Sequence, residues 1–179
     1  MEHAVKHAIS VKMDDNPVFF TSLLEKLQKI LDETKNNWIE RKKKLEEFIE
    51  RDVEKGTKSQ SEILGLDEKE FAFFEVVKKY ILEENELEEV KGNKIHEESE
   101  IYISQDIIEL SKAIAKDMSQ IIRDNYAVDW VTNNSKTSDV ERAIFMTLNK
   151  NYFKQIKFGV RKQMVQPLLN LAKKHFPVI

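Results

Sequence analysis

Cysteine is absent from the 179-residue sequence, and glycine (4) and proline (3) are scarce. Without cysteine the chain can form no disulfide, no thiolate metal site and no cysteine nucleophile, which agrees with a reducing compartment such as the cytoplasm. Turn-rich β architectures need more glycine and proline, so the scarcity of both favours helices. The longest apolar runs, such as residues 143–146, have four residues, whereas a bilayer span needs roughly 20. We therefore expect a cytoplasmic, all-α protein that does not enter a membrane.

The sequence contains enough apolar material for a core, because 41% of its residues are hydrophobic. Its length predicts a single domain over residues 1–179. The charges are segregated along the chain: residues 67–109 carry 14 acidic and 5 basic side chains (net −9), and residues 136–179 carry 2 acidic and 9 basic ones (net +7). A basic end of this kind can contact DNA, an acidic protein surface or the acidic middle of its own chain.

One long helix is predicted over residues 17–54. Asn16 is suited to be its N-cap, and Pro17 suits the first helical position, where no amide donor is needed. At 100° per residue the apolar side chains stay within an arc of about 140°. The side chains expected to line this buried stripe are Phe20, Leu27, Leu31, Trp38, Leu45 and Ile49. A break, if present, would fall at Asn36 and Asn37.

About four shorter helices are expected to pack with the long one. The polar residues 56–62 predict a linker before a second helix. Asp67 and Glu70 form a capping box at the start of that helix, whose apolar residues cover most of its circumference. The acid-rich residues 83–103 predict a mobile loop.

The C-terminal part of the sequence predicts three more helices. Ser104 can cap an amphipathic helix that runs to about residue 125, and the last helix is expected over residues 158–176. Pro167 should kink this last helix or mark a restart. Between them, Ser138 and Glu141 form a capping box.

The helix after Ser138 has apolar side chains on two faces. Its main arc contains Val140, Ile144, Phe145, Leu148 and Tyr152. Met146 and Phe153 lie on the far side, so either another helix of this domain or another protein should cover them.

The sequence contains none of the catalytic motifs that we sought. Its glycines are isolated, and none precedes Lys-Ser or Lys-Thr as in a phosphate-binding loop. No proline is followed by aspartate, as a Pro-Asp type nuclease requires. His3 and His7 are spaced for one helix face but lack a third ligand. We therefore assign no catalytic, cofactor-binding or metal-binding residue.

The basic cluster formed by residues 41–44 allows two interpretations. It could contact nucleic acid. On a helix, however, four consecutive residues point around the circumference, and Glu40, Glu46 and Glu47 lie close by. A solvated, charge-balanced face is therefore the favoured interpretation.

Two motifs in the sequence resemble one known family. Residues 63–74 (ILGLDEKEFAFF) and 121–130 (IIRDNYAVDW) are similar, in order and spacing, to the helical C-terminal region of the restriction subunit of type I restriction-modification enzymes. Residues 3–11 and 15–20, and the charged helix that contains Trp38, also resemble that region. The signature residues are Leu66, Phe74, Asp129 and Trp130; the Asp129 carboxylate is expected to cap a turn, while the indole of Trp130 packs between helices.

The resemblance implies an assembly role. The family's nuclease domain and ATP-driven translocase lie N-terminal to this region, so we expect this chain to be a non-catalytic fragment, with ATP and Mg²⁺ bound only by the parent subunit. The implied partners are the methyltransferase and specificity subunits and the rest of the restriction subunit. After Ser138 the sequence departs from the family. The family's helix at this place is rich in arginine, whereas residues 139–152 contain only Arg142 and Lys150 as basic residues.

Two hypotheses of function follow from the sequence. The first is a protein-docking module with an apolar centre and a positive rim. Its candidate residues are Met146, Phe153, Lys150, Lys154, Arg161 and Lys162. The second is a DNA-contacting element beside the motor, formed by the basic C-terminal segment.

Overall fold

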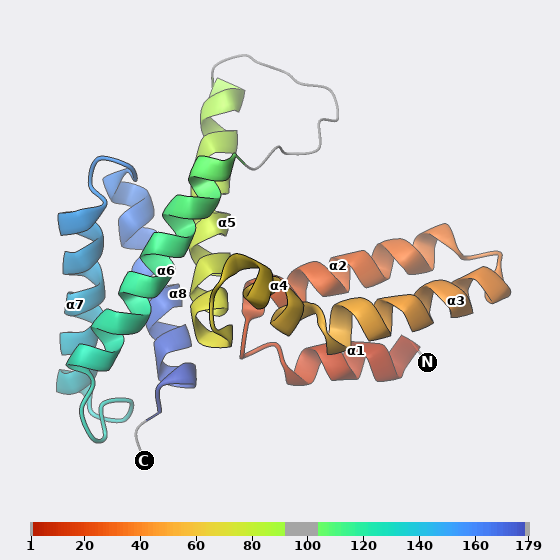
Figure 1. The fold of residues 1–179 in the computed structure, drawn as a ribbon, viewed down its shortest axis with the longest axis horizontal. Helices are drawn as coiled ribbons and strands as arrows, with labels where there is room; N and C mark the ends of the chain where they lie inside the picture. The colour runs from red at the N-terminus through yellow and green to blue at the C-terminus, as the bar shows by residue number, and fades with distance from the viewer. Residues whose placement is uncertain (1, 92–103, 178–179) are drawn as a thin grey trace. The chain divides into compact units, whose positions relative to one another are not determined.

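The computed structural model of the chain describes residues 2–91 and 104–177. Within these residues the chain is all-α, as predicted, and contains no strand (Figure 1). The elements are α1 (Glu2–Val11), α2 (Pro17–Glu33), α3 (Trp38–Phe48), the π-helical segment η1 (Ile49–Glu54), α4 (Gly56–Leu64), α5 (Glu68–Lys91), α6 (Gln105–Asn125), α7 (Asn134–Asn151) and α8 (Phe158–His175). No helix in the described ranges has the length and apolar content to cross a membrane.

The chain forms two compact units, Met1–Ala72 and Phe73–Ile179. The boundary between them falls within the sequence of α5. The single domain expected from the length remains a prediction.

The predicted long helix of residues 17–54 is wrong, because the structure interrupts it after Glu33. The chain leaves the helical path at Thr34, and Asn37 starts α3 by accepting a hydrogen bond from the Glu40 amide through its Oδ1 (3.1 Å). Helices α2 and α3 then run side by side in opposite directions (Figure 1). Leu27 and Leu31 of α2 and Leu45 and Phe48 of α3 are buried, so a common helical phase is compatible with a hairpin as well as with one straight helix.

Arg41 stabilises the break between the two helices. Its Nη2 donates to the carbonyl oxygens of Thr34 (3.1 Å) and Leu31 (3.5 Å), and its Nε donates to the Thr34 hydroxyl (3.3 Å). These contacts place a cation on carbonyl groups at the C-terminal end of α2, where the helix dipole is negative.

The remaining basic residues of this cluster lie on a charge-balanced face, which confirms the favoured interpretation. Lys42 and Lys43 each lie 3.9 Å from a glutamate one turn further along α3, and Lys44 Nζ lies 3.2 Å from Glu40 Oε1. The expected buried stripe also needs correction: Trp38 is 71% exposed at the first residue of α3, and Ile49 is only half-buried.

Residues 56–62 are not a linker, because they lie within α4. Gly56 allows close packing here: a Cβ on it would lie only 3.0 Å from the ring of Phe19. Helix α4 ends at Gly65, whose φ of 67° is the left-handed conformation that suits glycine. The predicted capping box follows, with Glu70 N donating to Asp67 Oδ1 (2.7 Å) and Asp67 N donating to Glu70 Oε2 (3.0 Å).

In the second unit, buried apolar side chains from α6, α7 and α8 form the core. Those with no exposed surface include Ile114, Met118, Ile122, Ile144, Leu148, Met164 and Leu168. Helix α6 begins as predicted, since Ser104 Oγ accepts a hydrogen bond from the Ile107 amide (3.4 Å).

Three predicted boundaries in this unit need correction. Helix α5 extends to Lys91, so residues 83–91 are helical rather than a loop, while residues 92–103 lie outside the described residues. Helix α7 begins four residues before Ser138, because Asn133 Oδ1 accepts from the Ser135 and Lys136 amides and caps it. Helix α8 continues through Pro167 without a restart.

Trp130 closes the turn between α6 and α7. Its side chain is fully buried, and its Nε1 donates to the Phe176 carbonyl (2.8 Å), just after the end of α8. The preceding Asp129 has a φ of 64°, and its carbonyl accepts from the Asn133 amide (2.9 Å). The ring of Phe176 stacks on Phe73 with centroids 6.3 Å apart. The other two signature residues, Leu66 and Phe74, are also buried.

We expect Trp130→Phe to lower the free energy of unfolding by about 2 kcal/mol, because the Phe176 carbonyl would lose its buried donor while most of the aromatic volume remains. Urea denaturation followed by circular dichroism at 222 nm measures this change.

Trp38→Phe is the matched control, because Trp38 is 71% exposed. It should change stability by less than about 0.5 kcal/mol. Equal effects of the two substitutions would contradict the role given to the Trp130 hydrogen bond.

Candidate protein-docking surface

Helix α7 buries one face, and exposed apolar side chains lie on its other face and in the turn that follows its last residue, Asn151. Val140, Ile144 and Leu148 are fully buried on the inner side. Met146 lies on this other face, whereas Phe153, which the sequence placed on the same helix, lies in the turn after it; both are 58% exposed. Phe153 is therefore not a core residue of the described structure.

Basic residues lie beside these exposed apolar side chains. Lys150 and Lys154 are exposed, and Lys154 Nζ lies 5.7 Å from the centre of the Phe153 ring. We call the surface formed by Met146, Lys150, Phe153 and Lys154 the α7 outer surface.

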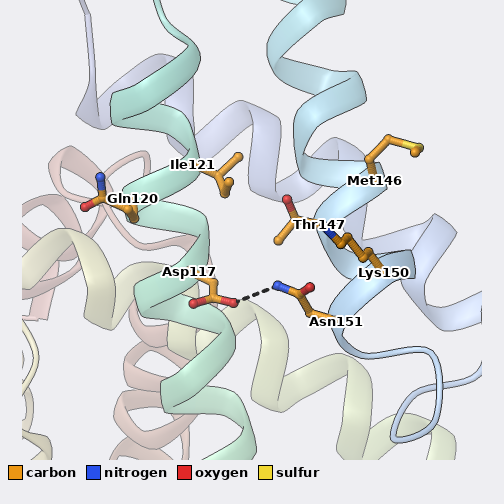
Figure 2. Close-up of a pocket in the computed structure, with 7 residues that line it drawn as sticks. All are labelled: Asp117, Gln120, Ile121, Met146, Thr147, Lys150 and Asn151. Carbon is orange, nitrogen blue, oxygen red and sulfur yellow. Dashed lines mark hydrogen bonds between the residues drawn. The ribbon is translucent and has the colours of Figure 1, made fainter.

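A groove of about 300 Å³ separates α7 from α6. Asp117, Gln120 and Ile121 line it from α6, and Met146, Thr147, Lys150 and Asn151 line it from α7. In Figure 2, Ile121 and Thr147 project toward each other across the groove, and Met146 lies at its outer edge. The groove is continuous with the α7 outer surface through Met146 and Lys150.

One end of this α6/α7 groove is held together by Asp117. Its Oδ2 accepts hydrogen bonds from the Tyr152 hydroxyl (2.6 Å) and from Asn151 Nδ2 (3.3 Å; Figure 2 shows the latter). Burial, followed by the hydrogen bond to Asp117, raises the pKa of the Tyr152 hydroxyl. Tyr152 therefore remains a neutral hydrogen-bond donor, which ties the C-terminal end of α7 to α6.

A second groove, of about 330 Å³, lies between α7 and α8. Its lining residues are Ser138, Glu141, Arg142, Phe145, Lys162, Val165 and Gln166. Phe145 also contacts Phe158 edge-to-face, with ring centroids 6.3 Å apart. Phe158 is 58% exposed.

The sequence interpretation missed Phe158. A signal for it does exist, because helical periodicity places Phe158 about 120° away from the buried Met164. An aromatic residue so far from the buried stripe of α8 is expected at the surface.

Arg161 does not belong to a docking surface, contrary to the expectation from sequence. It is only 6% exposed. Its Nε donates to Asn149 Oδ1 (2.9 Å), and its Nη1 donates to the Ile156 carbonyl. Arg161 therefore joins α8 to α7 in the interior of the unit. Its neighbour Lys162 is exposed and lines the α7/α8 groove.

The lysines of the α7 outer surface and of the α7/α8 groove have no carboxylate partner among the described residues. Lys150, Lys154 and Lys162 form no ion pair within the described ranges, and the chain has no Asp or Glu after Glu141. Lys157 does have a carboxylate partner, because its Nζ lies 2.7 Å from Glu84 Oε1. Glu84 belongs to the acidic middle of the chain, which is one of the contacts that the sequence allowed for the basic end. Packing against the chain's own acidic segment thus accounts for Lys157 but not for the α7 outer surface.

The chemistry of this surface suits binding. The α7 outer surface offers amines and apolar side chains, which together complement an apolar patch with acidic neighbours. In the described part of the chain, no group of three or more His, Cys, Asp or Glu residues could hold a metal ion.

Tyr152→Phe should destabilise the protein by about 2 kcal/mol near neutral pH, because it removes a hydrogen bond to a carboxylate. The folded-state pKa of Tyr152 lies above its unfolded value of about 10, so its contribution is complete below that pH and lost above it. The stability difference from wild type should therefore be constant up to about pH 9 and shrink above about pH 10.

Chemical denaturation over this pH range measures that difference. Tyr126→Phe is the control, since Tyr126 is 38% exposed and should leave stability nearly unchanged. A difference for Tyr152→Phe that did not change up to pH values well above 10 would contradict the assignment.

Comparison with known proteins identifies one matching family. The family described as "Type I restriction enzyme HindI endonuclease subunit-like, C-terminal" matches residues 1–174. No curated protein and no solved structure matches the chain. The family match covers nearly the whole chain and confirms the resemblance drawn from residues 63–74 and 121–130. The chain therefore belongs to the family of C-terminal regions of HindI-like type I restriction enzyme endonuclease subunits.

Proposed function

We propose that this chain is the assembly region of the restriction subunit and docks the motor and nuclease onto the methyltransferase-specificity core. The observation that carries the proposal is the exposure of Met146 and Phe153, each 58%, on the α7 outer surface. Met146 lies on α7 and Phe153 lies in the turn after it, and large apolar side chains that a unit leaves exposed are typical of a contact with another protein.

The composition of this surface fits an interface with a central anchor. Phe153 supplies a large aromatic side chain, and aromatic anchors carry much of the affinity of protein interfaces. Lys150 and Lys154 flank it without acidic partners among the described residues. Such rim charges mainly accelerate encounter and select an acidic partner.

The same proposal assigns no catalytic step to this chain. The sequence lacks a phosphate-binding loop and a Pro-Asp nuclease motif. ATP and Mg²⁺ would be bound by the translocase and nuclease domains of the parent subunit, and this chain would be a soluble component of a cytoplasmic complex.

A DNA contact is the second candidate function. It is supported by the absence of acidic residues after Glu141 in the sequence and by Lys150, Lys154 and Lys162, which form no ion pair with any residue that the structure describes. Apolar docking remains the favoured function, because Met146 and Phe153 offer nothing to a phosphate backbone. Affinity measured against salt distinguishes the two, since phosphate contacts give a steep log-log slope.

Phe153→Ala should weaken binding to the methyltransferase-specificity core by about 2 kcal/mol, because it removes the aromatic anchor of the interface. Helicity and the unfolding midpoint should stay close to wild type, since the side chain is 58% exposed. Co-elution and titration calorimetry with the purified core measure the first effect, and circular dichroism measures the second.

Val128→Ala is the control, because Val128 is also 58% exposed but lies outside the α7 outer surface. It should leave binding unchanged. Unaltered core binding by Phe153→Ala would refute this docking surface, and tight binding of duplex DNA at physiological salt without binding of the core would replace docking by the DNA function.

A further inference from the structure

We propose that the α7/α8 groove binds an acidic amphipathic helix from a partner protein. This groove is separate from the α7 outer surface, and the inference does not require the methyltransferase to be the partner. It rests on the shape of the groove, on its apolar floor and on its unbalanced charge.

The groove has the dimensions of a short helix contact. Ser138, Arg142 and Phe145 line it on successive turns of α7, and Lys162 and Gln166 line it from α8. At 1.5 Å per residue, the span from Ser138 to Phe145 is about 10 Å, or roughly two helical turns. Its volume is about 330 Å³.

The floor of the groove is apolar and extends to an exposed aromatic ring. Phe145 and Val165 form the floor between the polar walls. At the Phe145 end, Phe158 contacts Phe145 edge-to-face and is itself 58% exposed. An apolar stripe on an incoming helix would cover Phe145 and Phe158 together.

The lining of the groove carries two basic side chains, Arg142 and Lys162, and one acidic side chain, Glu141. Lys162 has no carboxylate partner in the parts of the chain described. Arg142 Nη1 lies 3.8 Å from Asp139 Oδ1, in a pair whose side chains are 73% and 62% exposed, so this ion pair is weak and easily replaced. No acidic residue follows Glu141 in the sequence, and carboxylates on a partner would complement Lys162.

A helix suits this groove better than a strand or a nucleic acid. The described residues contain no sheet edge to which a strand could add, so recognition must use side chains. A third helix can pack into the groove between two neighbouring helices by the usual ridge-and-groove contacts. The apolar side chains of Phe145 and Val165 offer no hydrogen-bond donor to a phosphate backbone.

The test uses the full chain and a defined probe. The probe is a synthetic helical peptide with leucines at i, i+4 and i+7 and glutamates on both sides of this stripe. A second peptide has lysine in place of every glutamate. Backbone amide shifts of the ¹⁵N-labelled chain, recorded during titration, give both the affinity and the position of binding.

We expect the glutamate peptide to shift the amides around Phe145, Lys162 and Gln166, and the lysine peptide to shift none of them. Lys162→Glu should weaken the glutamate peptide about tenfold, by reversing one wall charge. Lys116→Glu, the same change at an exposed position of α6, should have no effect. Equal binding of both peptides, shifts elsewhere, or no shifts at millimolar peptide would overturn the inference.

Two further arms separate this inference from the proposed function. Lys150→Glu should leave the peptide affinity unchanged while weakening binding to the methyltransferase-specificity core, because Lys150 belongs to the α7 outer surface. If Phe153→Ala lost binding to the methyltransferase-specificity core and the wild-type chain did not bind the glutamate peptide, only the groove inference would be overturned. If a short DNA duplex at physiological salt, rather than the peptide, shifted the groove amides, the groove would be a nucleic-acid surface instead.

Discussion

The burial of Trp130 is the constraint on which the second unit depends. The indole lies in the turn between α6 and α7, and its Nε1–H is bonded to the Phe176 carbonyl beyond the end of α8. A turn and a chain end that are 46 residues apart are thereby held together. Since the indole has no exposed surface, this hydrogen bond is shielded from water, and breaking it removes a buried donor from the Phe176 carbonyl.

Two sets of hydrogen bonds hold α7 in its orientation: the Trp130 bond in the turn before the helix, and a second set near the last residue of the helix. Tyr152 and Asn151 are bonded to Asp117 of α6, while Arg161 of α8 reaches Asn149. With both neighbours attached, α7 buries its inner stripe and leaves Met146 exposed. The polar contacts that stabilise the unit therefore also determine which apolar side chains remain available to a partner.

Much of the architecture can be predicted from local sequence. The scarcity of glycine and proline predicts helices, and the structure has them. Caps at Asn16, Asp67 and Ser104 were predicted correctly, because a capping side chain bonds to amides only two or three residues away. The exposure of Met146 opposite the buried stripe of α7 also follows from the periodicity of that helix, whereas Phe153, predicted on the same helix, lies in the turn after it. Each correctly predicted feature depends on hydrogen bonds or on a helical periodicity among residues that are close together in the sequence.

Tertiary structure alone decided the features that depend on contacts between helices. The apolar periodicity of residues 17–54 fits one long helix and the α2–α3 hairpin equally well. The hydrogen bonds from Arg41 to carbonyl groups at the end of α2 stabilise the hairpin. Gly56 indicated a linker, but the approach of Phe19 makes it part of a packed helix. Arg161 and Lys162 are adjacent cations in sequence, yet one is buried against Asn149 and the other is exposed. Such differences depend on which residues another helix brings near, and sequence periodicity within one helix carries no information about that.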